Sequence, residues 1–158
     1  MYKFIFPVLV VLIAFASCTK NVENSCPAVI TKAPDSQIVA LGRYLDSNHI
    51  VAVQDPRGFF YSISDTGVGQ QPNPCSIVTV NYTGKLTDSV NTMFDSNHNS
   101  KFTLSQVITG WQEALPLLRK GGSMQLYLPP FLAYGQGSTA SIPANSPLIF
   151  SIQLVGVQ

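Results

Sequence analysis

The chain has 158 residues, of which 46% are hydrophobic and only 11% are charged, and its formal net charge is +1. This length suits one domain with additional segments, and the composition allows a packed core and excludes disorder of the whole chain. The near-neutral charge and the absence of a Lys/Arg run argue against nucleic acid as a partner. The two histidines lie far apart, and no Cys/His pair has the spacing of metal ligands, so no metal is expected.

Residues 1–17 have the pattern of an export signal. Lys3 supplies the positive charge, and the apolar run from Phe4 to Ala16 is about 13 residues long, short of the roughly 20 that a spanning helix needs. The small residues before Cys18 resemble the lipobox of bacterial lipoproteins, in which the signal is cut before a cysteine that then receives lipid. This resemblance implies lipidation of Cys18, and the alternative is an ordinary cleaved signal with a chance cysteine.

Residues 18–33 are polar and irregular, and we interpret them as a tether between the lipid and the fold. With Cys18 assigned to the lipid, Cys26 and Cys75 remain as an even pair in an oxidising compartment. A disulfide between them is possible because Cys75 precedes a predicted strand to which the tether could be joined. The alternative is two free thiols.

Residues 34–49 are predicted to form a helical extension. Pro34 suits the first turn of a helix, and the helix should end near Ser47. The apolar residues at helical spacing, which define one face, are Ile38, Leu41, Tyr44 and Leu45.

Residues 50–158 are predicted to form an α+β domain in which an antiparallel β-sheet wraps around one short central helix. The predicted strands, recognised by alternation or β-rich composition, cover 50–53, 59–63, 76–86, 124–128 and 148–155. The helix should begin at Gly110 and be ended or kinked by Pro116.

Five motifs of this domain resemble those of the FKBP-type peptidyl-prolyl cis-trans isomerases. They are Val80–Leu86, Phe94-Asp95-Ser96, Gln106–Trp111, Ala133-Tyr134-Gly135, and Ile142–Asn145 with Leu148–Phe150. They occur in family order and at near-family spacing between Arg57 and Gln158. The resemblance implies the FKBP fold and peptidyl-prolyl isomerase activity. The helical extension is also similar to that of exported bacterial lipoproteins of this family.

The resemblance implies that ten residues of this sequence form the pocket of the family. It implies catalytic roles for Tyr82, Asp95, Ile108 and Tyr134, and substrate-binding roles for Phe94, Phe102, Val107, Trp111, Ile142 and Phe150. On pattern alone, the aromatic and aliphatic residues of this set would be assigned to the core. Asp95 is the exception, because a carboxylate is costly to bury without partners.

The sequence departs from the family pattern at the rim of the expected pocket. The hairpin 87–93 is longer than usual and lacks a glycine, the stretch 96–101 has no arginine for Asp95, and the loop 136–141 is short and has no histidine. These departures concern the rim and the substrate preference, and they leave the floor intact. Glu113, on the predicted helix, is interpreted as a solvated helix residue.

No hydrolase, phosphate-binding or zinc-protease motif appears, and no cofactor is expected. The first hypothesis is an isomerase that accelerates rotation about Xaa-Pro bonds of exported proteins through an apolar pocket, without covalent catalysis. The alternative is an FKBP-like lipoprotein that binds proline-containing segments or a partner protein with little turnover. In either case we expect a monomer, lipid-anchored to a bacterial membrane on the periplasmic or outer-surface side of the cell envelope.

Overall fold

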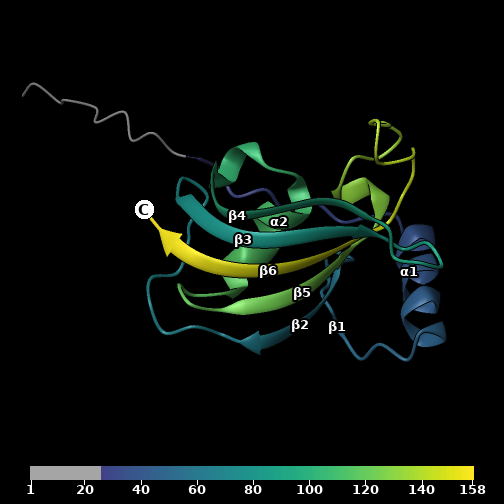
Figure 1. Ribbon diagram of the computed structural model, residues 1–158, viewed down its shortest axis with the longest axis horizontal. Helices are drawn as coiled ribbons and strands as arrows, with labels where there is room; N and C mark the ends of the chain where they lie inside the picture. The colour runs from purple at the N-terminus through teal and green to yellow at the C-terminus, as the bar shows by residue number, and fades with distance from the viewer. Residues whose placement is uncertain (1–25) are drawn as a thin grey trace, which may run out of the picture.

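A computed structural model of the protein describes residues 26–158 (Figure 1). The predicted signal peptide and Cys18 lie outside the described residues. In chain order the main elements are α1 (Asp35–Ser47), β1 (Val53–Gln54), β2 (Phe60–Asp65), β3 (Ile77–Leu86), β4 (Met93–Thr103), α2 (Thr109–Ala114), β5 (Ser123–Leu128) and β6 (Leu148–Val157). Short 3-10 turns are present at η1 (Leu104–Gln106), η2 (Leu115–Leu117) and η3 (Pro130–Leu132).

The six strands form one antiparallel sheet in the order β1-β2-β5-β6-β3-β4. β3 pairs with β6 along its length, from Val78 to Leu86, and with the edge strand β4 on its other side. The alternation predicted for β3 is present, since Val78 and Val80 are buried while Ile77 is exposed. β3 thus turns one set of side chains towards the core.

The helix α2 lies against one face of the sheet (Figure 1). Gly110 allows the close approach, because a Cβ at this position would overlap the side chain of Leu128 on β5. The buried side chains between helix and sheet include Trp111, Ala114, Val78, Val80, Leu126, Ile152 and Leu154. This arrangement confirms the predicted fold class.

The helix α1 stands at one end of the sheet (Figure 1), with the predicted apolar face turned inward. Its buried residues are Ile38, Leu41 and Leu45, which belong to the same core as the sheet. Gln37 Oε1 accepts a hydrogen bond from the N–H of Phe131 at 2.9 Å, and the Tyr44 hydroxyl donates to Asn91 Oδ1 at 2.9 Å. The helical extension therefore contacts two loops of the domain.

Two parts of the strand prediction differ from the structure. Residues 50–52 are not a strand, because the N–H of Ile50 donates to the carbonyl of Leu45 at the end of α1, at 2.9 Å. The strand β4 was not predicted. Its sequence is rich in Asn and Ser, and most of its side chains are exposed at the sheet edge, so it lacks the apolar alternation of a half-buried strand.

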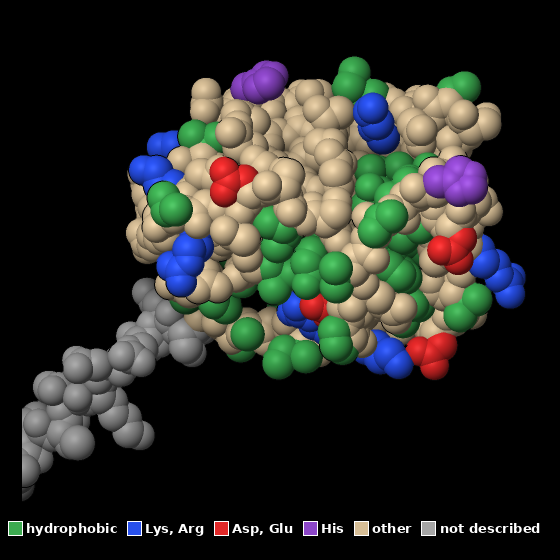
Figure 2. All heavy atoms as spheres, turned by 90° about the horizontal axis from the view of Figure 1, so that it is seen from below, with side chains coloured by type: hydrophobic (Ala, Val, Ile, Leu, Met, Phe, Trp, Pro, Cys, Tyr) green, Lys and Arg blue, Asp and Glu red, His purple; other side chains and the backbone are tan. Residues whose placement is uncertain are grey.

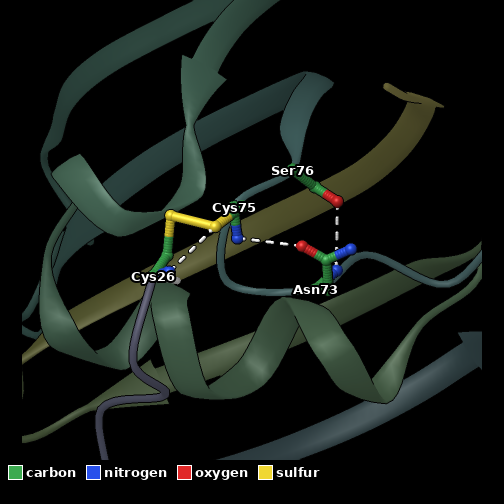
Figure 3. The surroundings of a disulfide bond; sticks show 4 residues. All are labelled: Cys26, Asn73, Cys75 and Ser76. Carbon is green, nitrogen blue, oxygen red and sulfur yellow. Dashed lines mark hydrogen bonds between the residues drawn. A yellow bond between two sulfur atoms is a disulfide. The ribbon is translucent and has the colours of Figure 1, made fainter. Parts of the chain in front are cut away.

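Residues 26–33, which we call the strap, have no regular secondary structure but are joined to the domain. Cys26 and Cys75 form a disulfide with their Cα atoms 5.2 Å apart (Figure 3). The N–H of Thr31 donates to Glu113 Oε1 at 2.7 Å, and the N–H of Ala33 donates to the carbonyl of Arg57 at 2.9 Å. The part of the expected tether that the structure describes is thus fixed against the domain.

The surface seen from the side of β1 and β2 carries patches of apolar side chains between scattered charged ones (Figure 2). Among the described residues, no helix is long and apolar enough to cross a membrane. Within residues 26–158 there is also no group of three or more His, Cys, Asp or Glu residues that could hold a metal ion.

Candidate active site

A pocket of about 340 Å³ opens between α2, β3, β4 and the loop that follows η3. Its lining consists of Tyr82, Phe94, Asp95, Phe102, Gln106, Val107, Ile108, Trp111, Tyr134 and Phe150. The structure thus brings together every predicted pocket residue except Ile142. That side chain is buried in the core, only 5% exposed, and it is not part of the lining. Gln106 is an addition, although it belongs to a motif already recognised in the sequence.

The indole of Trp111 is the centre of an aromatic cluster. Its ring lies edge-to-face with the rings of Tyr82, Phe102 and Phe150, at centroid distances of 5.2, 5.8 and 5.3 Å. Phe94 packs in the same manner on Phe150 at 5.7 Å. Edge-to-face pairs at these distances are favourable beyond the burial of area alone. The pocket therefore has a closely packed aromatic floor.

Asp95 and Tyr82 form the principal polar contact of the pocket. The Tyr82 hydroxyl donates to Asp95 Oδ2 at 2.6 Å. Burial, and then the hydrogen bond to the carboxylate, raise the pKa of Tyr82 well above its usual range, so the phenol stays protonated. Among residues 26–158 the recorded ion pairs are Lys32–Asp35 and Arg57–Asp55, so Asp95 has a phenol and no cation as its partner.

Two further polar groups flank the apolar floor. The carbonyl of Ile108 accepts the N–H groups of Trp111 and Gln112 at the start of α2, at 2.9 and 3.2 Å. No intramolecular hydrogen bond occupies the N–H of Ile108 in the described part of the chain. Tyr134 follows η3 and is 44% exposed at the mouth of the pocket. An apolar cavity with a free backbone donor and a hydroxyl can hold a peptide by its carbonyl groups.

Comparison with known proteins agrees with this geometry. Residues 69–155, more than half of the chain, match the family described as FKBP-type peptidyl-prolyl cis-trans isomerase. The chain belongs to this family. The FKBP-type isomerase FkpA of Aeromonas hydrophila is 40% identical over 105 residues, covering 64% of this chain and 38% of that protein. The outer membrane protein MIP of Legionella longbeachae is 43% identical over 108 residues, covering 65% and 46%.

Solved structures show the same FKBP fold. The crystal structure of FkpA from Escherichia coli matches with a TM-score of 0.69 and 32% identity, over 78% of this chain and 60% of that one. A peptidyl-prolyl isomerase from Pseudomonas syringae matches with a TM-score of 0.68 and 28% identity, over 81% and 98%. The chain spans less than half the length of the curated relatives named above.

The β3–β4 hairpin at the rim of this FKBP pocket has no glycine, and its left-handed turn position is an asparagine. Asn91 adopts a left-handed conformation with φ of 50°, which asparagine tolerates better than most residues. Asp88 closes the turn by accepting the N–H and the hydroxyl of Thr92. In the short loop 136–141, the Thr139 hydroxyl accepts the N–H of Ile142 at 3.0 Å. The unusual rim segments are thus ordered by their own hydrogen bonds.

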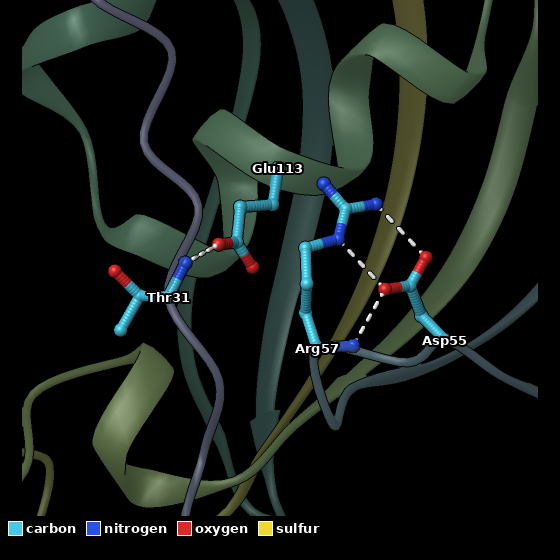
Figure 4. Close-up of polar contacts among 4 residues, drawn as sticks. All are labelled: Thr31, Asp55, Arg57 and Glu113. Carbon is cyan, nitrogen blue, oxygen red and sulfur yellow. Dashed lines mark hydrogen bonds and ion pairs between the residues drawn. The ribbon is translucent and has the colours of Figure 1, made fainter.

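Glu113 is buried in this FKBP domain, and the interpretation as a solvated helix residue is wrong. Its side chain is 2% exposed, Oε1 accepts the Thr31 N–H, and Oε2 is buried without a hydrogen-bond partner (Figure 4). Burial raises the pKa of Glu113, while the Thr31 hydrogen bond and the nearby Arg57 guanidinium oppose this effect. The sequence carried no sign of this contact because Thr31 lies 82 positions away and outside the family motifs.

Proposed function

We propose that the chain is a peptidyl-prolyl cis-trans isomerase that accelerates rotation about Xaa-Pro bonds of exported proteins. The observation that carries the proposal is the pocket in which Trp111 forms an apolar floor beside the N–H of Ile108 and the hydroxyl of Tyr134. Membership of the FKBP family supports the same reaction.

Isomerisation of an Xaa-Pro bond requires no covalent bond to be made to carbon. Rotation about an amide meets a barrier of about 18–20 kcal/mol that arises mainly from resonance of the planar form. An apolar cavity disfavours the charge-separated planar amide and accepts the hydrophobic proline ring, so it favours the twisted transition state over the ground state. A thousandfold acceleration needs only about 4 kcal/mol at about 1.4 kcal/mol for each factor of ten. Desolvation and one or two hydrogen bonds can supply this amount.

The residues take distinct parts in this mechanism. Trp111 and the surrounding aromatic rings hold the proline ring, while the N–H of Ile108 and the hydroxyl of Tyr134 bind the flanking peptide carbonyls. Asp95 fixes the Tyr82 hydroxyl through the 2.6 Å hydrogen bond and so maintains the wall of the pocket. No proton transfer is needed in the rate-limiting step.

A turnover assay on short Xaa-Pro peptides tests the proposal, with an apolar residue before proline because the pocket lining is mainly aromatic and aliphatic. Micromolar protein should raise the rate of isomerisation well above the uncatalysed rate. An unchanged rate would refute the isomerase proposal. If the same peptides nevertheless bind, the alternative of a proline-segment or partner-binding protein with little turnover takes its place.

The pH profile tests the absence of acid–base and covalent steps. Activity should be nearly flat between about pH 6 and pH 8.5, because the pocket holds no histidine and Tyr82 stays protonated. Asp95→Asn should keep the shape of the pocket and lose little activity. A bell-shaped profile near neutrality, or complete loss of activity in a folded Asp95→Asn variant, would show that an acid–base step exists.

We propose further that the chain is exported and lipid-anchored to the envelope through Cys18. The apolar segment before Cys18 supports this, as does the name of the similar outer membrane protein MIP of Legionella longbeachae. Membrane fractionation with radiolabelled lipid tests it: Cys18→Ala should give a soluble or uncleaved product without label. Unchanged membrane association of Cys18→Ala would contradict the proposal.

A further inference from the structure

The helix α2 joins the pocket floor to a buried carboxylate on its opposite side. Trp111 and Glu113 are two residues apart, which corresponds to about 200° around the axis at about 100° per residue. Trp111 therefore lines the pocket, while Glu113 lies on the strap side of the helix. Figure 4 shows the Glu113 side chain directed at Thr31. A displacement of the Glu113 side of this six-residue helix moves the indole as well.

The hydrogen bond that the Glu113 side chain accepts is donated by a backbone N–H of the strap. With 2% exposure, the carboxylate is shielded from water, and the N–H of Thr31 is its recorded donor among residues 26–158. The Arg57 guanidinium is held by Asp55, with Nε and Nη2 at 2.7 and 2.8 Å from the two carboxylate oxygens. Because a buried carboxylate is costly without donors, the position of Glu113 depends on the strap.

The strap is itself fixed on both sides of Thr31. The disulfide holds Cys26 at the start of the segment that leads into β3 (Figure 3), and Ala33 is buried and bonded to the carbonyl of Arg57. The strap therefore reaches Glu113 from two anchored ends, although it contributes no residue to the pocket lining.

We propose that the strap is a brace for the pocket floor and that Glu113 is a positioning residue, which transmits the position of the strap to Trp111. This proposal concerns the same pocket as the proposed isomerase function. It rests on that function only in the experiments that measure activity. The strap lies N-terminal to the segment that matches the family, residues 69–155. The proposal gives this strap a part in shaping the substrate pocket.

Thr31→Pro tests the brace, because it removes the backbone N–H that Glu113 accepts, while Thr31→Ala keeps that N–H and serves as the matched control. Trp111 is the only tryptophan of the chain, so its fluorescence reports on the pocket floor directly. We expect Thr31→Pro to shift the emission and to raise KM about fivefold with kcat little changed. Thr31→Ala should behave as the wild type. Reduction of the disulfide in the wild-type protein should shift the emission less than Thr31→Pro does, because the Thr31 and Ala33 hydrogen bonds remain.

A folded Thr31→Pro variant with the emission and KM of the wild type would overturn the brace. Should this variant fail to fold, Glu113→Gln, which keeps an oxygen acceptor, is compared with Glu113→Met, which is of similar length and lacks one. Wild-type emission and KM in Glu113→Met would then overturn the proposal. If the wild-type protein shows no turnover, the proposed function fails, but emission and peptide affinity still decide whether the brace exists.

Discussion

Removal of the Cys26–Cys75 disulfide should lower the free energy of unfolding by about 4 kcal/mol. The bridge spans 49 positions, and it encloses α1, β1 and β2 in one covalent loop. In the chain-entropy description the loss is about 2.1 + 1.5R ln n cal/mol/K, which at this loop length is about 14 cal/mol/K, or about 4 kcal/mol at 25 °C. The strap remains near its site through Thr31 and Ala33, so the folded state should persist without the bridge.

Urea denaturation of the wild type and of a Cys26→Ser/Cys75→Ser variant measures this difference. For a slope of about 2 kcal/mol/M, the midpoint of the variant should fall by about 2 M. Wild-type protein in reductant should unfold like the variant, and reductant should leave the variant unchanged. A midpoint shift below about 0.3 M, or two reactive thiols in the unreduced, unfolded wild-type protein, would refute the reasoning.

The remaining predictions concern single side chains of α2 and the pocket mouth. Trp111→Ala should lower the free energy of unfolding by about 3–5 kcal/mol, because it removes the ring at the centre of three aromatic contacts. Denaturation followed by circular dichroism measures this loss, and a value below about 1 kcal/mol would contradict the prediction. Tyr134→Phe should lower kcat/KM about two- to twelvefold through one lost hydrogen bond and leave stability unchanged, since the residue is exposed. Glu113 has a raised pKa, so folding favours its protonated form, and wild-type stability relative to Glu113→Gln should fall as pH rises above the ordinary value of 4.5. A pH-independent difference in denaturation midpoints would contradict the last prediction.

The parts of the fold that could be predicted are those in which local pattern and burial agree. In β3, the alternation that places Val78 and Val80 inward is visible in the sequence. In α1, the helical spacing of Ile38 and Leu41 likewise marks the face that is buried. The pocket lining could be assigned because its members lie within recognisable motifs, even though positions 82 and 150 meet only in the folded sheet.

The parts that escaped prediction depend on contacts between distant segments. β4 is an edge strand with mostly exposed polar residues, so no apolar period marks it, and its position follows from pairing with β3. The burial of Glu113 follows from the strap, whose residues look like a linker in composition. Ile142 belongs to a pocket motif, yet its side chain packs into the core instead of the cavity.

The disulfide at Cys26 also limits the distance between a lipid-anchored domain and its membrane. If Cys18 carries the lipid, eight peptide units lead from it to Cys26, which at about 3.6 Å each gives a reach of about 29 Å. Without the bridge, the first anchored residue is Thr31, and the reach grows to about 47 Å. The volume within this fully extended reach rises about fourfold. The effective concentration towards a partner at the same membrane, which falls as about the −3/2 power of tether length, drops about twofold. The bridge would thus keep the point at which the chain joins the domain, Cys26, within about 29 Å of the lipid.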